Sequence, residues 1–127
     1  MTDKLKDEIK KSFDGLEGED VISLLLEIRT ELSEYSPHNT EPVDLVQWIP
    51  LTKLEANDYN PNSVATNEMR LLKHSIMQDG FTQPAVCVYD DSKDKYVLID
   101  GFHRYSTVRL NKDLRDKLGG NVPAVVL

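Results

Sequence analysis

The stretch IDGFHRY, residues 99–105, marks a passage from a strand into a helix. The run at 96–99 is aromatic and aliphatic, which predicts a strand. Gly101 can adopt the backbone conformations that a tight turn requires, and the residues from Phe102 to about Asn111 are predicted to form a helix. The N–H groups at the start of a helix, together with the helix dipole, favour a bound anion. The stretch therefore predicts an anion site built largely from backbone.

Three side chains of this stretch could take part in phosphate chemistry. Arg104 can donate two parallel hydrogen bonds to a phosphate, and His103 can donate another or act as a general acid or base. Asp100 could hold a divalent metal ion beside the phosphates or orient a hydroxyl group. The purely structural alternative is that Asp100 caps the helix and Arg104 pairs with a surface carboxylate. The spacing alone leaves both interpretations open.

The segment from residue 43 to residue 127 alternates between strand and helix patterns. Short apolar and β-branched runs predict strands at 45–49, 85–89, 96–99 and 122–127. Asn67 is placed to cap a helix that runs to about Gln78 and stops at Gly80, and residues 60–62 (NPN) predict a turn. We therefore expect an α+β fold with a small mixed sheet and packed helices.

The first 35 residues have the periodicity of helices. Apolar residues recur at helical spacing over about 5–16 and 19–35, and Gly15 and Gly18 predict a break between them. A polar linker that contains two prolines follows at 36–42. We expect a helical hairpin and a linker over residues 1–42, followed by a second domain over residues 43–127.

Negative charge gathers in the first part of the chain. Residues 1–43 carry 11 acidic and 5 basic side chains, whereas residues 44–127 carry 11 acidic and 10 basic ones. A protein that binds DNA without a partner usually has more basic than acidic side chains. DNA binding by this chain is therefore not expected. We expect the apolar stripe of the helices to pack on the second domain or on a second copy, and their acidic face to attract a basic protein partner.

The composition excludes several classes of protein. The chain has 127 residues, 39% of them hydrophobic and 29% charged, as in ordinary globular domains. A single cysteine excludes an internal disulfide framework. The sequence contains no apolar run long enough for a membrane span and no signal peptide. We therefore expect a cytoplasmic protein, and its hydrophobic last strand suggests truncation at the C-terminus.

Four sequence landmarks, taken in order, resemble the ParB/sulfiredoxin superfamily, also described as ParB-like nuclease domains. They are NPN at 60–62, LKHSIMQDGFTQPAV at 72–86, DGFHR at 100–104 and VPAVV at 122–126. The resemblance implies a ParB/sulfiredoxin-like fold. It is strongest toward the short prophage proteins of the immunoglobulin-binding regulator B type, which are described as co-activators of gene expression.

The resemblance also implies a nucleotide-binding regulatory module. The phosphates of CTP, ATP or ADP would lie at Gly101, Phe102, His103 and Arg104, with Gln83 and Pro84 at the border of the nucleotide pocket. Gln83 could read the base or ribose, or it could satisfy backbone groups. Sulfiredoxins carry their catalytic cysteine where this chain has Phe102, so we do not expect sulfiredoxin activity. Partition proteins bind CTP with a further helix for which this chain has no matching segment.

The alternative function is a phosphotransferase that resembles free serine kinase. In that interpretation Asp100 would be catalytic and would hold Mg²⁺, while His103 and Arg104 would bind phosphates. An upstream glutamate would be needed as the base, for which Glu55 and Glu68 are the candidates. A nuclease is not favoured, because no cluster of carboxylates has two-metal spacing.

Other residues whose side chains could react or bind a ligand are expected to have structural roles. Cys87 lies in a β-rich run, where a cysteine is usually buried and inert. His74 has no partner ligands at metal spacing, and His38 lies in the polar linker. Trp48 is expected to pack in the core or at an interface.

Overall fold

The computed structural model describes residues 1–56 and 66–127. The chain divides into two compact units, Met1–Asn39 and Thr40–Leu127. The predicted turn at 60–62 lies outside the described residues.

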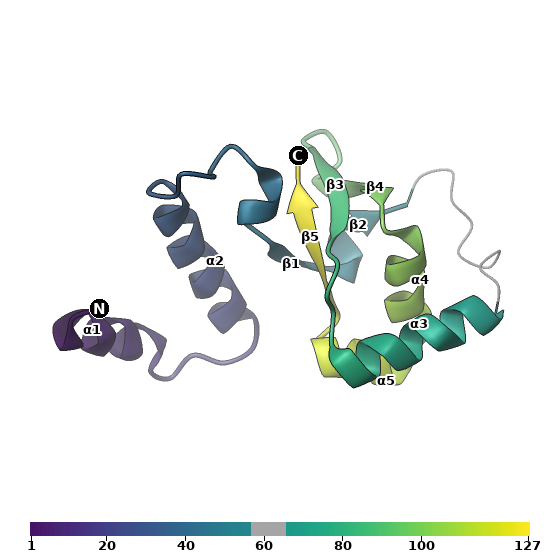
Figure 1. Ribbon diagram of the computed structural model, residues 1–127, viewed down its shortest axis with the longest axis horizontal. Coiled ribbons are helices and arrows are strands. Elements are labelled where there is room, and N and C mark those ends of the chain that lie inside the picture. Colours follow the sequence, from purple (N-terminus) through teal and green to yellow (C-terminus); the bar gives the residue numbers. More distant parts are fainter. Residues whose placement is uncertain (57–65) are drawn as a thin grey trace. The chain divides into compact units, whose positions relative to one another are not determined.

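The first unit consists of two helices, α1 (Asp3–Phe13) and α2 (Glu19–Ser33). Thr2 caps α1 by accepting a hydrogen bond from the Leu5 N–H at 3.2 Å. Gly15 and Gly18 both have positive φ angles, +78° and +55°, so the predicted break between the helices is present. The helices are not packed along their lengths (Figure 1), and neither contains a buried residue.

The second unit is a mixed five-stranded sheet with helices, which confirms the α+β prediction. Its strand order is β1-β5-β3-β4-β2. The β1–β5 and β3–β4 pairs are antiparallel, and the β3–β5 and β2–β4 pairs are parallel. The strands are β1 (Gln47–Pro50), β2 (Leu54–Glu55), β3 (Ala85–Asp90), β4 (Lys95–Asp100) and β5 (Asn121–Val126).

The described part of the second unit contains three α-helices, and Figure 1 shows them beside the sheet. They are α3 (Thr66–Asp79), α4 (Phe102–Leu110) and α5 (Lys112–Leu118), and short 3₁₀ turns occupy Pro42–Asp44 and Leu51–Lys53. No helix in the described part of the chain has the length and apolar character of a membrane span.

The core forms where one face of the sheet meets these helices. Alternate strand residues point to the same face, so Ala85 and Cys87 of β3 share a face with Leu98 and Ala124, their cross-strand partners or neighbours. The core cluster adds side chains from the helices and the edge strands: Ile49, Leu54, Ile76, Tyr105, Val108, Leu114 and Val122.

Several expected boundaries differ from those observed. α3 begins at Thr66, so Asn67 lies inside the helix rather than at its cap. Pro50 belongs to β1, which it can do because β1 is an edge strand and an edge strand tolerates a missing N–H group. The sequence analysis did not predict β2 or α5.

Candidate functional site

The turn between β4 and α4 requires glycine at position 101. Gly101 has a φ of +95°, and a Cβ atom there would lie 2.9 Å from the Cβ of Ala85 and 3.0 Å from its Cα. A side chain would therefore meet both conformational strain and the backbone of β3. The close approach joins the turn to β3 and fixes the point at which α4 begins.

The N-terminus of α4 faces this turn, and its N-cap residue, Gly101, has no side chain with which to cap the helix. Gly101 is the N-cap residue, and its carbonyl accepts a hydrogen bond from the Tyr105 N–H at 2.9 Å. Asp100 is not the cap: its Oδ1 accepts a hydrogen bond from the adjacent Gly101 N–H at 2.8 Å. The positive end of the α4 dipole therefore lies where the sequence predicts an anion.

Arg104 and Gln83 meet beside this helix terminus. The Arg104 Nη2 donates a hydrogen bond to Gln83 Oε1 at 2.5 Å. Gln83 lies in the loop that ends at β3, 21 residues before Arg104. The structure thus unites two predicted site residues, and the described partner of Arg104 is an amide oxygen rather than the surface carboxylate of the alternative interpretation.

The other predicted site residues flank the turn: Phe102 and His103 begin α4, and Pro84 lies directly before β3. His103 is exposed in the first turn of α4, and its carbonyl accepts a hydrogen bond from Thr107 Oγ1 at 2.7 Å. Phe102 is partly buried against the core cluster, and Pro84 is half-buried immediately before Ala85. Phe102 therefore anchors the helix start on its apolar side.

The carboxylates proposed for catalysis are spread over several elements. Asp100 is exposed at the end of β4, and Glu68 is exposed in the first turn of α3. In β2, Glu55 Oε1 accepts from Lys93 Nζ at 3.5 Å, and Oε2 is buried with no hydrogen-bond partner among the described residues. Residues 1–56 and 66–127 contain no group of three His, Cys, Asp or Glu side chains able to hold a metal ion.

Cys87 is a core residue, as the sequence predicts. It is fully buried, and its Sγ lies 3.7 Å from the carbonyl oxygen of Val125. Burial raises the pKa of the Cys87 thiol to about 11. The thiol therefore remains protonated at neutral pH and is a poor nucleophile.

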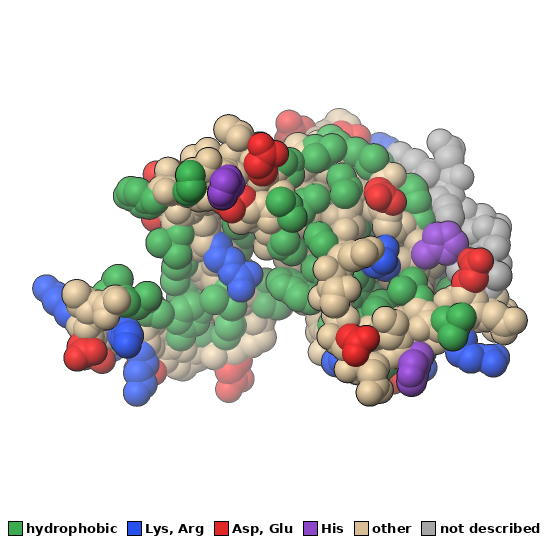
Figure 2. Space-filling view, viewed as in Figure 1, with side chains coloured by type: hydrophobic (Ala, Val, Ile, Leu, Met, Phe, Trp, Pro, Cys, Tyr) green, Lys and Arg blue, Asp and Glu red, His purple; other side chains and the backbone are tan. Residues whose placement is uncertain are grey.

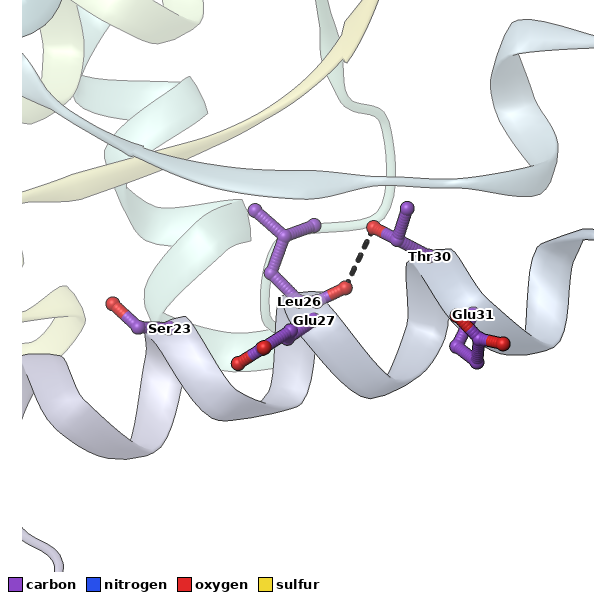
Figure 3. A pocket seen from close by; sticks show the side chains of 5 residues that line it. All are labelled: Ser23, Leu26, Glu27, Thr30 and Glu31. Atoms are coloured by element: carbon purple, nitrogen blue, oxygen red, sulfur yellow. Dashed lines mark hydrogen bonds between the residues drawn. The ribbon is translucent and has the colours of Figure 1, made fainter.

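The first unit has a surface feature of its own. A shallow hollow runs along α2 and is lined by Ser23, Leu26, Glu27, Thr30 and Glu31 (Figure 3). Thr30 Oγ1 donates to the Leu26 carbonyl within that helix at 2.7 Å. On the face shown in Figure 2, acidic and basic side chains are interspersed rather than gathered by sign.

Ala85 is the site residue that the sequence analysis missed. Its small side chain is what lets the Gly101 turn approach β3. The sequence contains one indication of this role, because Ala85 directly follows Gln83 and Pro84 and stands at the first position of a predicted strand. A contact to a glycine 16 positions later cannot be read from local patterns.

A family model described as ParB N-terminal domain matches residues 35–118. The chain belongs to the ParB N-terminal domain family. The match includes the Gly101 turn, α4 and the loop that carries Gln83. It also confirms the superfamily indicated by the ordered motifs.

One relative and several solved structures resemble this ParB-like chain. The protein YbdM of Escherichia coli strain K12 is 39% identical over all 127 residues, which span 60% of its length. The chain therefore covers less than two thirds of that relative.

Three solved structures share the fold at a TM-score of 0.50. Sulfiredoxin from Arabidopsis thaliana is 24% identical over 65% of this chain and 83% of its own. ParB from Caulobacter crescentus, complexed with CTP-γ-S, is 21% identical over 65% of this chain and 43% of its own. SbnI from Staphylococcus aureus is 21% identical over 69% of this chain and 32% of its own. These likenesses confirm the ParB/sulfiredoxin-like fold.

Proposed function

We propose that this ParB-like domain binds a nucleotide through its phosphates at the start of α4. The observation that carries the proposal is the convergence of three features at one turn. The start of α4 faces the turn with the positive end of the helix dipole, which favours a bound anion. Gly101 lets the backbone pass close to β3, and Arg104 adds a cation in the first turn of α4.

The fold gives the proposal a precedent. The ParB structure from Caulobacter crescentus contains CTP-γ-S, so a domain of this fold can hold a nucleotide. In this chain Gly101, Phe102, His103 and Arg104 would surround the phosphates, with Gln83 and Pro84 alongside. The base is not assigned, so CTP, ATP and ADP are all candidates. Mg²⁺ would be held by Asp100 together with phosphate oxygens, because it binds few protein ligands when phosphates are present.

The biological role that we propose for this module is regulatory. Binding without turnover would let the nucleotide change the state of the domain, as in a co-activator of gene expression of the prophage type. A cytoplasmic location is part of the same proposal.

Thermal denaturation with added nucleotides tests the binding. A ligand at 100 times its dissociation constant should stabilise the protein by about 2.7 kcal/mol. We expect stabilisation by at least one of CTP, ATP and ADP, measured with and without Mg²⁺. No shift with any of the three would refute the proposal.

Arg104→Ala should abolish that stabilisation and leave unfolding cooperative. The matched control is Arg109→Ala, which removes the same guanidinium from the last turn of the same helix. Loss of the response in both variants would show that net charge, rather than the turn, controls binding. Unfolding of Arg104→Ala at room temperature would make Arg104 a structural residue.

The alternative is phosphoryl transfer to a small molecule, as the resemblance to free serine kinase implies. Asp100 is the exposed carboxylate at the turn and would activate the hydroxyl or hold Mg²⁺. Incubation with ATP or ADP, Mg²⁺ and free serine should then yield phosphoserine, and Asp100→Asn should abolish the product. Binding without product favours the regulatory function.

A further inference from the structure

The contact between Gln83 and Arg104 lies close along the chain to the point where Ala85 approaches Gly101. Ala85 begins β3 two residues after Gln83, is fully buried and pairs with Ala124 of β5. Its Cα and Cβ lie directly against Gly101, three residues before Arg104. Gln83 and Arg104 therefore each lie within three residues of the point at which β3 contacts the turn.

The length and freedom of the arginine side chain make such a contact useful. An unrestrained arginine samples many rotamers and must lose that freedom when it binds a ligand. Here Arg104 Nη2 donates to Gln83 Oε1, so the guanidinium has a preferred position before any anion arrives. A guanidinium has five N–H donors, and this contact uses one of them.

The chemistry of the partner matters as much as its position. A carboxylate would accept two parallel hydrogen bonds from one edge of the guanidinium and would compete with phosphate for its charge. An amide oxygen carries no net charge, and in this contact it accepts a single hydrogen bond from the guanidinium. Gln83 can therefore hold Arg104 without neutralising it.

We propose that Gln83 is a positioning residue that holds the Arg104 guanidinium at the start of α4, ready to bind a phosphate. This inference rests on the proposed function at that turn. It assigns Gln83 a role different from reading the base or ribose, because the acceptor oxygen of Gln83 is engaged with Arg104.

Two ligands distinguish positioning from base reading in the full chain. Inorganic triphosphate has neither base nor ribose, whereas CTP and ATP have both. Positioning predicts that Gln83→Ala weakens triphosphate and nucleotide binding by the same factor, about two- to tenfold, which is what one net hydrogen bond contributes. Weakening confined to the nucleotides would overturn the proposal in favour of base reading.

Two further variants sharpen the test. Gln83→Glu should weaken triphosphate binding more than Gln83→Ala does, because an ion pair occupies the guanidinium and adds negative charge. Gln78→Ala, which removes an exposed glutamine from α3, is the matched control and should leave affinity unchanged. A Gln83→Glu variant that binds as tightly as the parent would contradict the proposal.

A readout without ligand separates this inference from the proposed function. The Arg104 Nε–H signal in NMR relaxation experiments should report an ordered side chain in the parent and a mobile one in Gln83→Ala. If no phosphate compound binds the parent, the proposed function fails, but an ordered Arg104 that becomes mobile still supports positioning. Equal mobility in the two proteins would overturn the inference whatever the binding result.

Discussion

Residues 1–39 and residues 40–127 differ in how they use their apolar side chains. The first unit has two helices in which no residue is buried. The second has a core in which Ala85, Cys87, Val108 and Leu114 are completely inaccessible. The first unit also carries a net charge of −5, and the second only −2.

The difference follows from the number of layers that each unit can assemble. A sheet with helices on one face encloses side chains between two layers. Two short helices that are not packed along their lengths enclose none, however regular their apolar stripe is. Stability and structural uniqueness should therefore reside in residues 40–127.

Separation of the two units should have the largest effect. Helices of 11 and 15 residues are marginal in water without packing. We expect the peptide 1–39 to show little helix by circular dichroism, and the fragment 40–127 to unfold in one cooperative transition. A cooperative thermal transition in the isolated peptide 1–39 would contradict this interpretation.

A slightly longer deletion tests our prediction that the apolar stripe is covered by the second domain or by a second copy. Removal of residues 1–42 should change the oligomeric state or cause aggregation, measured by light scattering. A soluble fragment with unchanged stoichiometry and stability would show that the helices are an independent appendage.

Truncation of one leucine in each unit should have the next largest effect. Leu114 of α5 is fully buried, whereas Leu32 of α2 is 61% exposed. Leu114→Ala should lower the free energy of unfolding by about 2–5 kcal/mol, and Leu32→Ala by no more than about 0.5 kcal/mol. Denaturant titration measures both values, and similar losses would show that α2 contributes to a shared core.

A third pair of substitutions compares two glycines of the second unit. Gly80 and Gly101 both have positive φ angles, but only Gly101 lies against another described segment. Gly80→Ala should cost about 1–2 kcal/mol through backbone strain alone. Gly101→Ala should cost about 2–4 kcal/mol, because its Cβ also meets Ala85. Equal losses of unfolding free energy in denaturant titrations would show that β3 can shift to accommodate a Cβ atom at position 101.

The sequence predicted the parts of the fold that have strong local patterns. The helix from Phe102, the strands predicted at 85–89 and 96–99, and the last strand are all present near their predicted positions. α5 was missed because its sequence, KDLRDKL, contains only two apolar residues, and β2 was missed because it is two residues long. Such elements are stabilised by their neighbours rather than by their own periodicity.

The backbone of the candidate site could be predicted from the sequence, but the contacts between its residues could not. A strand, a glycine and a helix in succession predict that the start of a helix faces a tight turn, and the structure contains this arrangement at Gly101. The hydrogen bond between Gln83 and Arg104 and the contact between Ala85 and Gly101 depend on how β3 and β4 pair. Register of that kind is a property of the assembled sheet.

The smallest expected effect is the response of the second unit to acid. Three aspartates there have pKa values below the ordinary one. The pKa of Asp94 is lowered chiefly by hydrogen bonds from Lys53 and Tyr89, that of Asp90 by Ser92, and that of Asp113 by Lys73. All three carboxyl groups are on the surface, so each contribution is small.

The direction of the acid effect follows from linkage between protonation and folding. A carboxyl group whose pKa is lowered by folding stabilises the protein above its ordinary pKa, about 3.9, and loses that contribution as the pH falls through the folded value. Asp113→Asn should therefore reduce the loss of stability below about pH 4, because Lys73 Nζ lies 2.8 Å from the Asp113 carboxylate. Thermal denaturation from strongly acidic to near-neutral pH measures the dependence in the full chain and in the fragment 40–127. Asp116→Asn, which removes a carboxylate paired within α5 instead of across two helices, is the control. An acid response that disappears when residues 1–39 are removed would place the responsible groups in the first unit and contradict this assignment.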